Sequence, residues 1–277
     1  MKNSYRLLSL LIGYTMLYGP LFLVTMFSFN SSRSVKIWTG FSTQWYKALI
    51  ENQWIRESLF TSLLVGACTA TISVALGTFA AVLLSRFLTK TKKYFFSAII
   101  TAPIITPDVV TGISLAIFFS YLSNIFGWPR NHGYSSIILA HVAITVSYTT
   151  LMIQAKLADV DKTLEEAAMN LGATPFQSFF VITLPLISRS MILAWMLAFV
   201  LSIDDIVVSN FVAGPDVTTL SMLIFSSIRT GISPEINALS SVVLAILLSF
   251  ACSAAWISHK HAQNNHHHSE NDTKHQT

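Results

Sequence analysis

The stretch DKTLEEAAMNLGATPFQSFFVITLP, residues 161–185, is a polar, helix-prone insert in a chain that is otherwise almost entirely apolar. Its first half predicts a short helix, because Asp161 or Thr163 can cap a helix start. Thr163 and Glu166 also have the spacing of a capping box, in which each side chain bonds the exposed backbone N–H of the other. A helix is therefore expected to begin within the first three residues of the stretch.

The second half of the stretch predicts a sharp turn and another short helix. Gly172 can take the left-handed conformation that ends many helices, because it carries no Cβ. Thr174 can cap the next helix, with Pro175 in the first turn, where no N–H is needed. The pair Ala167 and Ala168 leaves a bare patch on the first helix, against which another protein could pack closely.

The composition excludes an ordinary soluble domain. Hydrophobic residues make up 53% of the 277 residues, only 11% are charged, and the mean hydropathy is +0.59, whereas soluble domains carry roughly 25% charged residues. The positive-inside bias of membrane proteins explains the net charge of +4 more simply than nucleic-acid binding does. We therefore expect an all-α polytopic membrane protein. Cys68 and Cys252 lie in apolar runs and are interpreted as small buried hydrophobic residues.

Six apolar segments are long enough to cross a bilayer, since about 20 apolar residues in a helix span a hydrocarbon core of about 30 Å. The predicted spans are residues 7–29, 58–84, 94–122, 135–154, 189–211 and 234–258. The first is interpreted as an uncleaved span, because it is too long for the apolar region of a signal peptide. Together they are expected to form one membrane domain over residues 1–258.

Residues outside the spans are expected to have smaller structural roles. Residues 44–50 predict a short amphipathic helix at the membrane interface, and residues 217–228 predict a surface or re-entrant helix too short to span. The tail, residues 259–277, is polar and low in complexity, and is expected to be disordered. Its histidines at 266–268 are interpreted as part of a spacer rather than as a metal site. His141 is interpreted as a hydrogen-bonded packing residue of the fourth span.

The distribution of positive charge predicts the orientation. The loops assigned to the inside carry eleven basic residues: Lys2, Arg6, Arg86, Lys90, Lys92, Lys93, Lys156, Lys162, Arg189, Lys260 and Lys274. The loops assigned to the outside carry six: Arg33, Lys36, Lys47, Arg56, Arg130 and Arg229. Because basic residues concentrate in cytoplasmic loops, both termini and the stretch 161–185 are expected to be cytoplasmic.

Acidic residues within the predicted spans indicate a transport pathway. Asp108 follows Pro103 and Pro107, which interrupt the third span, and Asp204 and Asp205 lie in the fifth. A carboxylate at the bilayer centre costs roughly 2.5–3.5 kcal/mol on insertion scales, so such residues usually face a cavity. Asp108 and Asp204 are expected at similar depth, where they would attract a cation, whereas the adjacent Asp205 points about 100° away from Asp204. Alternatively, these acids cap broken helices or bond to Ser and Thr neighbours.

The stretch 161–185 resembles a family motif. Glu166-Ala167-Ala168, Gly172 and Ile182-x-Leu184-Pro185 match the EAA loop, E-A-A-x3-G-x9-I-x-L-P, of the membrane permease subunits of ABC importers. The resemblance implies a type I importer permease fold and a cytoplasmic coupling loop, residues 161–185, that docks in a groove of an ATPase subunit. The expected ATPase-coupling residues are Glu166, Ala167, Ala168, Gly172, Leu184 and Pro185. The alternative is an ordinary linker between two membrane helices.

Segments throughout the chain resemble the permease subunits of spermidine/putrescine ABC importers, with putrescine permeases the most similar. The matching segments are Asn30-Ser31-Ser32, Thr101-Ala102-Pro103, Pro107-Asp108-Val109-Val110-Thr111-Gly112, Leu201-Ser202-Ile203-Asp204-Asp205 and Pro234-Glu235-Ile236-Asn237-Ala238. The resemblance implies a second, different permease subunit, a cytoplasmic ATPase dimer and a periplasmic polyamine-binding protein. It also implies a location in the bacterial inner membrane. The expected residues of the polyamine pathway are then Asp108, Asp204 and Asp205.

Two other functions stay open. An ABC permease for another solute would have the same coupling loop, although acids in the spans argue against an anion. An ion-coupled secondary transporter would suit intramembrane aspartates, but the intact EAA loop and the lack of a detectable inverted repeat argue against it. The sequence contains no P-loop, HExxH or G-x-S-x-G motif. A translocase subunit without catalytic residues, metal or cofactor is therefore expected, with ATP hydrolysis carried out by a separate subunit.

Overall fold

The computed structural model describes residues 2–33, 37–129, 133–231, 233–246 and 248–249. Within these residues the fold is all-α, and the only extended pairing is an isolated bridge between Asn30 and Phe41. The chain divides into two units, Met1–Gln53 with Ser227–Thr277, and Trp54–Ser226. Each unit is described by itself.

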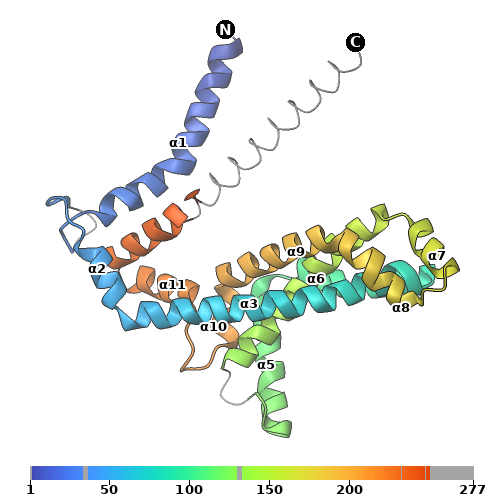
Figure 1. The fold of residues 1–277 in the computed structure, drawn as a ribbon. Helices are drawn as coiled ribbons and strands as arrows, with labels where there is room; N and C mark the ends of the chain where they lie inside the picture. The colour runs from blue at the N-terminus through green and yellow to red at the C-terminus, as the bar shows by residue number, and fades with distance from the viewer. Residues whose placement is uncertain (1, 34–36, 130–132, 232, 247, 250–277) are drawn as a thin grey trace, which may run out of the picture. The chain divides into compact units, whose positions relative to one another are not determined.

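The elements of the first unit are α1 (Lys2–Ser28), α2 (Gln44–Glu51) and a helix at Pro234–Ile246. The second unit contains α3 (Gln53–Val82), η1 (Leu83–Phe87), α4 (Lys90–Ile105), α5 (Asp108–Phe126), α6 (Tyr134–Asp159), α7 (Lys162–Asn170), α8 (Pro175–Ser178), η3 (Phe179–Thr183), α9 (Leu184–Asp204) and α10 (Val207–Val212), with α11 (Leu220–Thr230) at the boundary (Figure 1). The segments η1 and η3 are π-helical and continue α3 and α8 without a gap.

Five helical segments are long and apolar enough to cross a membrane: Tyr5–Ser28, Gln53–Phe87, Asp108–Phe126, Tyr134–Asp159 and Pro175–Asp204. Each overlaps one of the first five predicted spans. The sixth predicted span, 234–258, is described only in part, as the helix Pro234–Ile246. The predicted tail, 259–277, with its three histidines, lies outside the described residues.

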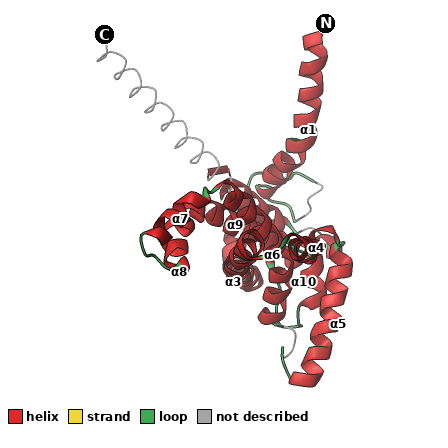
Figure 2. Ribbon diagram, turned by 90° about the vertical axis from the view of Figure 1, so that its right-hand side faces the viewer, coloured by secondary structure: helices red, strands yellow, loops and turns green. Residues whose placement is uncertain are grey.

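The predicted third span is two helices rather than one. The helix α4 ends at Ile105, and Thr106 and Pro107 are extended, with ψ angles of 132° and 138°. A residue before proline is pushed out of the α conformation by the proline ring, and this explains the break. Figures 1 and 2 show α5 leaving the direction shared by α3, α6 and α9. Pro103, by contrast, lies inside α4 and does not interrupt it.

The predicted fifth span, 189–211, begins earlier and is interrupted. Its helix runs without a gap from Pro175 through η3 into α9, which ends at Asp204. Asp205 is extended, with a ψ angle of 125°, and α10 begins two residues later. The predicted span therefore contains a break, because Asp205 leaves the helix and its carboxylate caps the next one.

The second unit holds two apolar clusters separated by a polar layer. One cluster contains Val65, Phe119, Ile137, Ala140, Val208, Val212 and Val217. The other contains Val74, Ala81, Ile153, Leu157, Val160, Ile187 and Ala194. Between them along α3 and α6, the Ser73 and Thr145 hydroxyls lie 2.7 Å apart, and the Thr149 hydroxyl donates to the Ser73 carbonyl at 2.8 Å. Such bonds between helices satisfy polar groups that lipid cannot.

Close contact between α3 and α6 depends on Gly77. A Cβ at this position would lie 2.9 Å from the Thr149 Cβ and 3.0 Å from the Thr150 backbone nitrogen. Neither contact can relax without moving the α6 backbone. A residue without a side chain at this position of α3 therefore permits the close packing of the two helices.

Gly77→Val should therefore lower the free energy of unfolding by about 1–3 kcal/mol, as overpacking usually does. The measurement is thermal unfolding of the purified chain in detergent. Gly13→Val is the matched control, because no atom lies within 4 Å of a Cβ built at Gly13. Equal melting temperatures for Gly77→Val and the wild type would contradict the packing described here.

The first unit confirms the predicted short helix at residues 44–50, which is α2. The side chain of Trp45 does not lie at an exposed interface, however. It is buried, and its indole Nε1–H donates to the Asn30 carbonyl at 2.6 Å. At the end of α2, the Asn52 amide donates to the Glu235 carboxylate at 2.9 Å, which joins α2 to the helix Pro234–Ile246 within the same unit.

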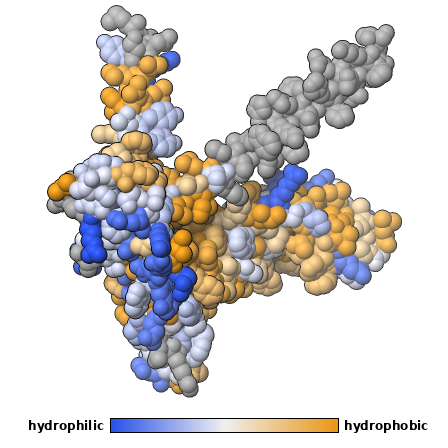
Figure 3. Space-filling model, turned by 60° about the vertical axis from the view of Figure 1, so that its left-hand side comes forward, coloured by the Kyte–Doolittle hydropathy of each residue, from blue (hydrophilic) through white to orange (hydrophobic). Residues whose placement is uncertain are grey.

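The surface of the helices is strongly apolar. In α1, no residue of the most apolar 18-residue window is buried, and Met16 and Phe22 are among its exposed side chains. Figure 3 shows apolar side chains covering much of the visible surface of the helices, with hydrophilic ones gathered in patches. An exterior of this kind suits contact with lipid or with apolar surfaces of other membrane subunits.

Candidate functional site

The stretch 161–185, which is predicted to be a coupling loop, is built from two capped helices. The Thr163 backbone N–H donates to Asp161 Oδ1 at 3.0 Å, and this bond lowers the pKa of the Asp161 carboxyl below its ordinary value. Asp161 is therefore the cap of α7, so the first of the two predicted alternatives holds. In α8, the Gln177 N–H donates to the Thr174 hydroxyl at 3.3 Å, and the Thr174 N–H donates to the Gln177 side chain at 2.9 Å. This reciprocal pair is a capping box.

The turn between the two helices depends on Gly172. Its φ angle is +95°, a conformation that favours glycine, and the space around it is open. The Gly172 N–H donates to the Met169 carbonyl at 3.0 Å, and the Ala173 N–H donates to the Ala168 carbonyl at 3.1 Å. The predicted pair of short helices with a glycine turn is therefore present. Leu184 and Pro185 lie beyond this turn, in the first turn of α9.

Two adjacent glutamates of α7 point in different directions. Glu166 and Ala167 are exposed and Ala168 is half-buried, so the surface predicted to contact a partner faces outward. Glu165 instead faces the chain, and its Oε1 lies 2.7 Å from Arg86 Nη2 in η1. The Arg86 and Glu165 side chains are only 15% and 19% exposed.

Sequence reasoning missed Arg86 and Glu165. Arg86 was counted only among the basic residues of the inside loops, and Glu165 was not singled out. The signal that could have found Glu165 is its position beside Glu166. Adjacent residues of a helix point about 100° apart, so the two acids cannot both point directly at one partner.

The three acids of the predicted pathway lie at the two helix breaks. Asp108 is the first residue of α5 and is exposed, and Asp204 is the last residue of α9 and is also exposed. The helices α5 and α10 pack together, and a Cβ on Gly112 would lie 2.7 Å from Phe211 Cδ2 and 3.3 Å from Val208 Cα.

Each of the two exposed acids lies four residues before a member of this contact, Asp108 within α5 and Asp204 across the break between α9 and α10. Asp108 precedes Gly112 by four residues, and Asp204 precedes Val208 by four. The packing of α5 on α10 therefore brings the two breaks toward the same region of the second unit.

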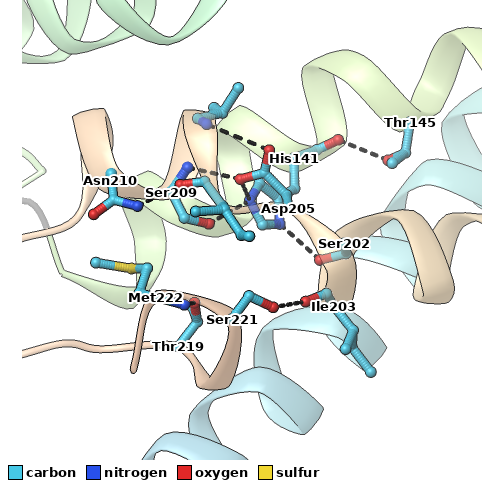
Figure 4. Close-up of polar contacts among 12 residues, drawn as sticks. His141, Thr145, Ser202, Ile203, Asp205, Ser209, Asn210, Thr219, Ser221 and Met222 are labelled. Carbon is cyan, nitrogen blue, oxygen red and sulfur yellow. Dashed lines mark hydrogen bonds and ion pairs between the residues drawn. The ribbon is translucent and has the colours of Figure 1, made fainter. Parts of the chain in front are cut away.

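Asp205 is held within the second unit instead. Its Oδ2 accepts the Ser209 backbone N–H at 2.7 Å, and its Oδ1 accepts the Val208 N–H at 3.3 Å, so it caps α10. His141 Nε2 lies 3.2 Å from Asp205 Oδ2, and His141 Nδ1 lies 2.7 Å from Ser202 Oγ (Figure 4). These contacts tie α6, α9 and α10 together at the break.

The three acids differ in their surroundings. His141 is 2% exposed and hydrogen-bonded on both ring nitrogens, as predicted for a packing residue. The bonds of Asp205 match the capping alternative considered for these residues. Asp108 and Asp204 keep exposed carboxylates that can meet a cation.

Asp205→Ala should lower the free energy of unfolding by about 1–3 kcal/mol, because it leaves buried donors near the α9–α10 break without an acceptor. Thermal unfolding in detergent measures this change. Asp204→Ala is the matched control, since it removes an adjacent but exposed carboxylate. If both variants unfold at the same temperature, Asp205 does not hold the break.

Comparison with known proteins places this chain among transport permeases. The family model for "Binding-protein-dependent transport system inner membrane component" matches residues 73–263. The putrescine transport system permease protein PotI of Escherichia coli K12 is 46% identical over 243 residues, covering 88% of this chain and 86% of that protein.

The spermidine/putrescine transport system permease protein PotC of Escherichia coli K12 is 34% identical over 235 residues, with 85% of this chain and 86% of PotC covered. PotC of Haemophilus influenzae is 32% identical over 266 residues, covering 96% of this chain and 98% of that protein.

Solved structures share the fold. A bacterial ABC transporter involved in the import of the acidic polysaccharide alginate superposes with a TM-score of 0.70 and 16% identity, covering 91% of this chain and 93% of that one. A bacterial alginate ABC transporter in complex with an alginate pentasaccharide-bound periplasmic protein gives a TM-score of 0.68 at 15% identity, covering 90% of this chain and 93% of that one. At these identities the likeness concerns the fold alone.

Proposed function

The chain belongs to the family of binding-protein-dependent transport system inner membrane components, and on that premise we propose that it translocates polyamines as a permease subunit of an ATP-driven importer. Members of this family are permease subunits rather than enzymes, and this chain is a multi-pass membrane protein. The observation that carries the polyamine assignment is the identity with a putrescine permease over most of the chain.

The motor is a separate subunit. The coupling loop presents Glu166, Ala167 and the tip at Gly172 on an exposed surface, on which an ATPase can bind. The small Ala167 side chain permits close approach, and Glu166 offers a carboxylate for charge-assisted hydrogen bonds. The chain itself contains no P-loop to bind a nucleotide.

The orientation follows from charge. Basic residues concentrate in the loops on the side of the coupling loop, so both termini and this loop lie in the cytoplasm of a bacterial inner membrane. A cytoplasmic ATPase dimer, a second permease subunit and a periplasmic polyamine-binding protein complete the assembly. The fold neighbour bound to a periplasmic protein supports a partner of this last kind.

The pathway carries a cation past carboxylates. Putrescine and spermidine are positively charged at neutral pH, and Asp108 and Asp204 supply exposed negative charge at two helix breaks whose neighbouring helices pack together. A site that conducts must bind strongly enough to admit the cargo and weakly enough to release it. Two carboxylates at the breaks suit such transient contacts.

Transport proceeds by alternating access. Closure of the ATPase dimer around ATP moves the coupling loop, and the membrane helices then open toward the periplasm to receive polyamine from the docked binding protein. Hydrolysis reopens the dimer and returns the helices to the inward-open state. This chain supplies the lever and part of the pathway, and the ATPase supplies the energy.

Uptake of labelled putrescine by the complete assembly in proteoliposomes tests this function. We expect uptake that requires ATP inside and the binding protein outside, and that unlabelled putrescine or spermidine suppresses. Suppression only by an unrelated solute would indicate a permease for that solute. Uptake that persists with an inactive ATPase but collapses with an uncoupler would indicate an ion-coupled transporter.

A further inference from the structure

Glu165 forms a junction between the coupling loop and the ends of two long membrane helices. Its Oε1 lies 2.7 Å from Arg86 Nη2, and the Thr183 hydroxyl donates to the same oxygen. The Ser178 hydroxyl donates to the Glu165 backbone carbonyl at 3.4 Å. One residue of α7 therefore bonds to η1, to α8 and to η3.

The two side chains that meet Glu165 both lie in π-helical segments. Arg86 belongs to η1, which ends the α3 helix, and Thr183 belongs to η3, which leads into α9. Such widened turns are rare and frequently occur at functional sites. Glu165 thus bonds to the π-helical segment after α3 and to the π-helical segment before α9.

The junction lies beside an apolar cavity of about 610 Å³. Arg86, Glu165 and Thr183 line it together with apolar side chains of α3 and α8, including Phe79 and Phe176. Charges next to apolar surface and largely removed from water interact more strongly than charges in bulk solvent. The pair therefore resists separation when α7 moves.

We propose that Glu165 is a positioning residue that transmits movement of the coupling loop to α3 and α9, through Arg86 and Thr183. This inference rests on the proposed function, because it assumes that an ATPase moves α7. Glu166 contacts the motor from the exposed face of α7, and Glu165, which points about 100° away toward η1 and η3, carries the displacement inward. Breaking the junction uncouples ATP hydrolysis from transport without detaching the ATPase.

The test is a charge swap in the complete assembly reconstituted in proteoliposomes. Arg86→Glu and Glu165→Arg each place like charges at the junction, whereas the double variant R86E/E165R restores an ion pair. Thr183→Val is a milder change, because it removes only the hydroxyl. Lys156→Glu is the matched control, since Lys156 and Asp159 form an exposed pair at 3.9 Å.

Three quantities are measured for each variant: ATPase subunit retained on the purified permease, ATP hydrolysed, and putrescine imported. We expect each single reversal to retain the ATPase but to lower putrescine imported per ATP by about tenfold, as mutations within a coupling network can. The double variant should recover to within about twofold of the wild type. Thr183→Val should lower the ratio by about threefold, and Lys156→Glu should not change it.

Unchanged import per ATP in both reversals and in Thr183→Val would overturn the inference. So would a double variant as defective as the singles, or loss of the ATPase from either single, because the pair would then serve assembly. The proposed function fails separately, if the wild-type assembly itself imports no polyamine.

Discussion

Glu166→Lys is expected to abolish polyamine uptake while leaving membrane insertion intact. Glu166 is exposed on α7, one position from the half-buried junction at Glu165, so the substitution changes the outward surface of the coupling loop. Losing one partner of a charged interface contact costs about 2–5 kcal/mol, which corresponds to at least a thirtyfold weaker association. A lysine also adds repulsion wherever the ATPase presents a basic group.

The measurement is ATPase subunit retained on the purified permease, together with uptake of labelled putrescine. Glu51→Lys is the matched control, because Glu51 is an exposed glutamate at the end of α2, in the loop expected on the periplasmic side. Its ATPase binding should equal that of the wild type. Normal uptake by Glu166→Lys would refute the docking role of the coupling loop.

The double variant Asp108→Asn and Asp204→Asn is expected to lower putrescine uptake by about a hundredfold, with each single substitution giving about tenfold. A hydrogen bond to a charged group contributes about 1.5–3 kcal/mol, so each lost carboxylate removes roughly tenfold in binding of the cation. Asparagine keeps the shape of the side chain and removes only the charge. Both carboxylates are exposed, so the fold should not depend on them.

Initial rates of putrescine uptake at several concentrations of loaded binding protein measure this effect. The ATPase should stay bound, which separates a pathway defect from a docking defect. Asp159→Asn removes an exposed carboxylate at the end of α6 and serves as the control. Full activity in the double variant would leave Asp108 and Asp204 without a role in the pathway.

Local sequence patterns predicted the coupling loop because its structure depends on local chemistry. The caps at Asp161 and Thr174 and the turn at Gly172 each involve residues within a few positions of one another. The break before Asp108 was also visible, since Pro107 forces the preceding residue into an extended conformation.

Long-range contacts were not predictable in this way. Glu165 and Glu166 are equivalent by composition, and only Arg86, far away in sequence, decides which of them turns inward. Likewise, the sequence indicates that the adjacent Asp204 and Asp205 point in different directions, but not which of them is held within the chain. His141 and the α10 backbone instead hold Asp205 at the break, and this capping also explains why the fifth span is not one helix.

The most direct test of the account is a photo-crosslinking amino acid placed at Ala167 in the complete assembly while it imports polyamine. Ala167 is exposed beside Glu166 on the outward surface of α7, so the probe should not disturb the chain itself. The account predicts a crosslink to the cytoplasmic ATPase subunit. A transporting assembly in which this position crosslinks only to lipid, or to a protein on the periplasmic side, would contradict it.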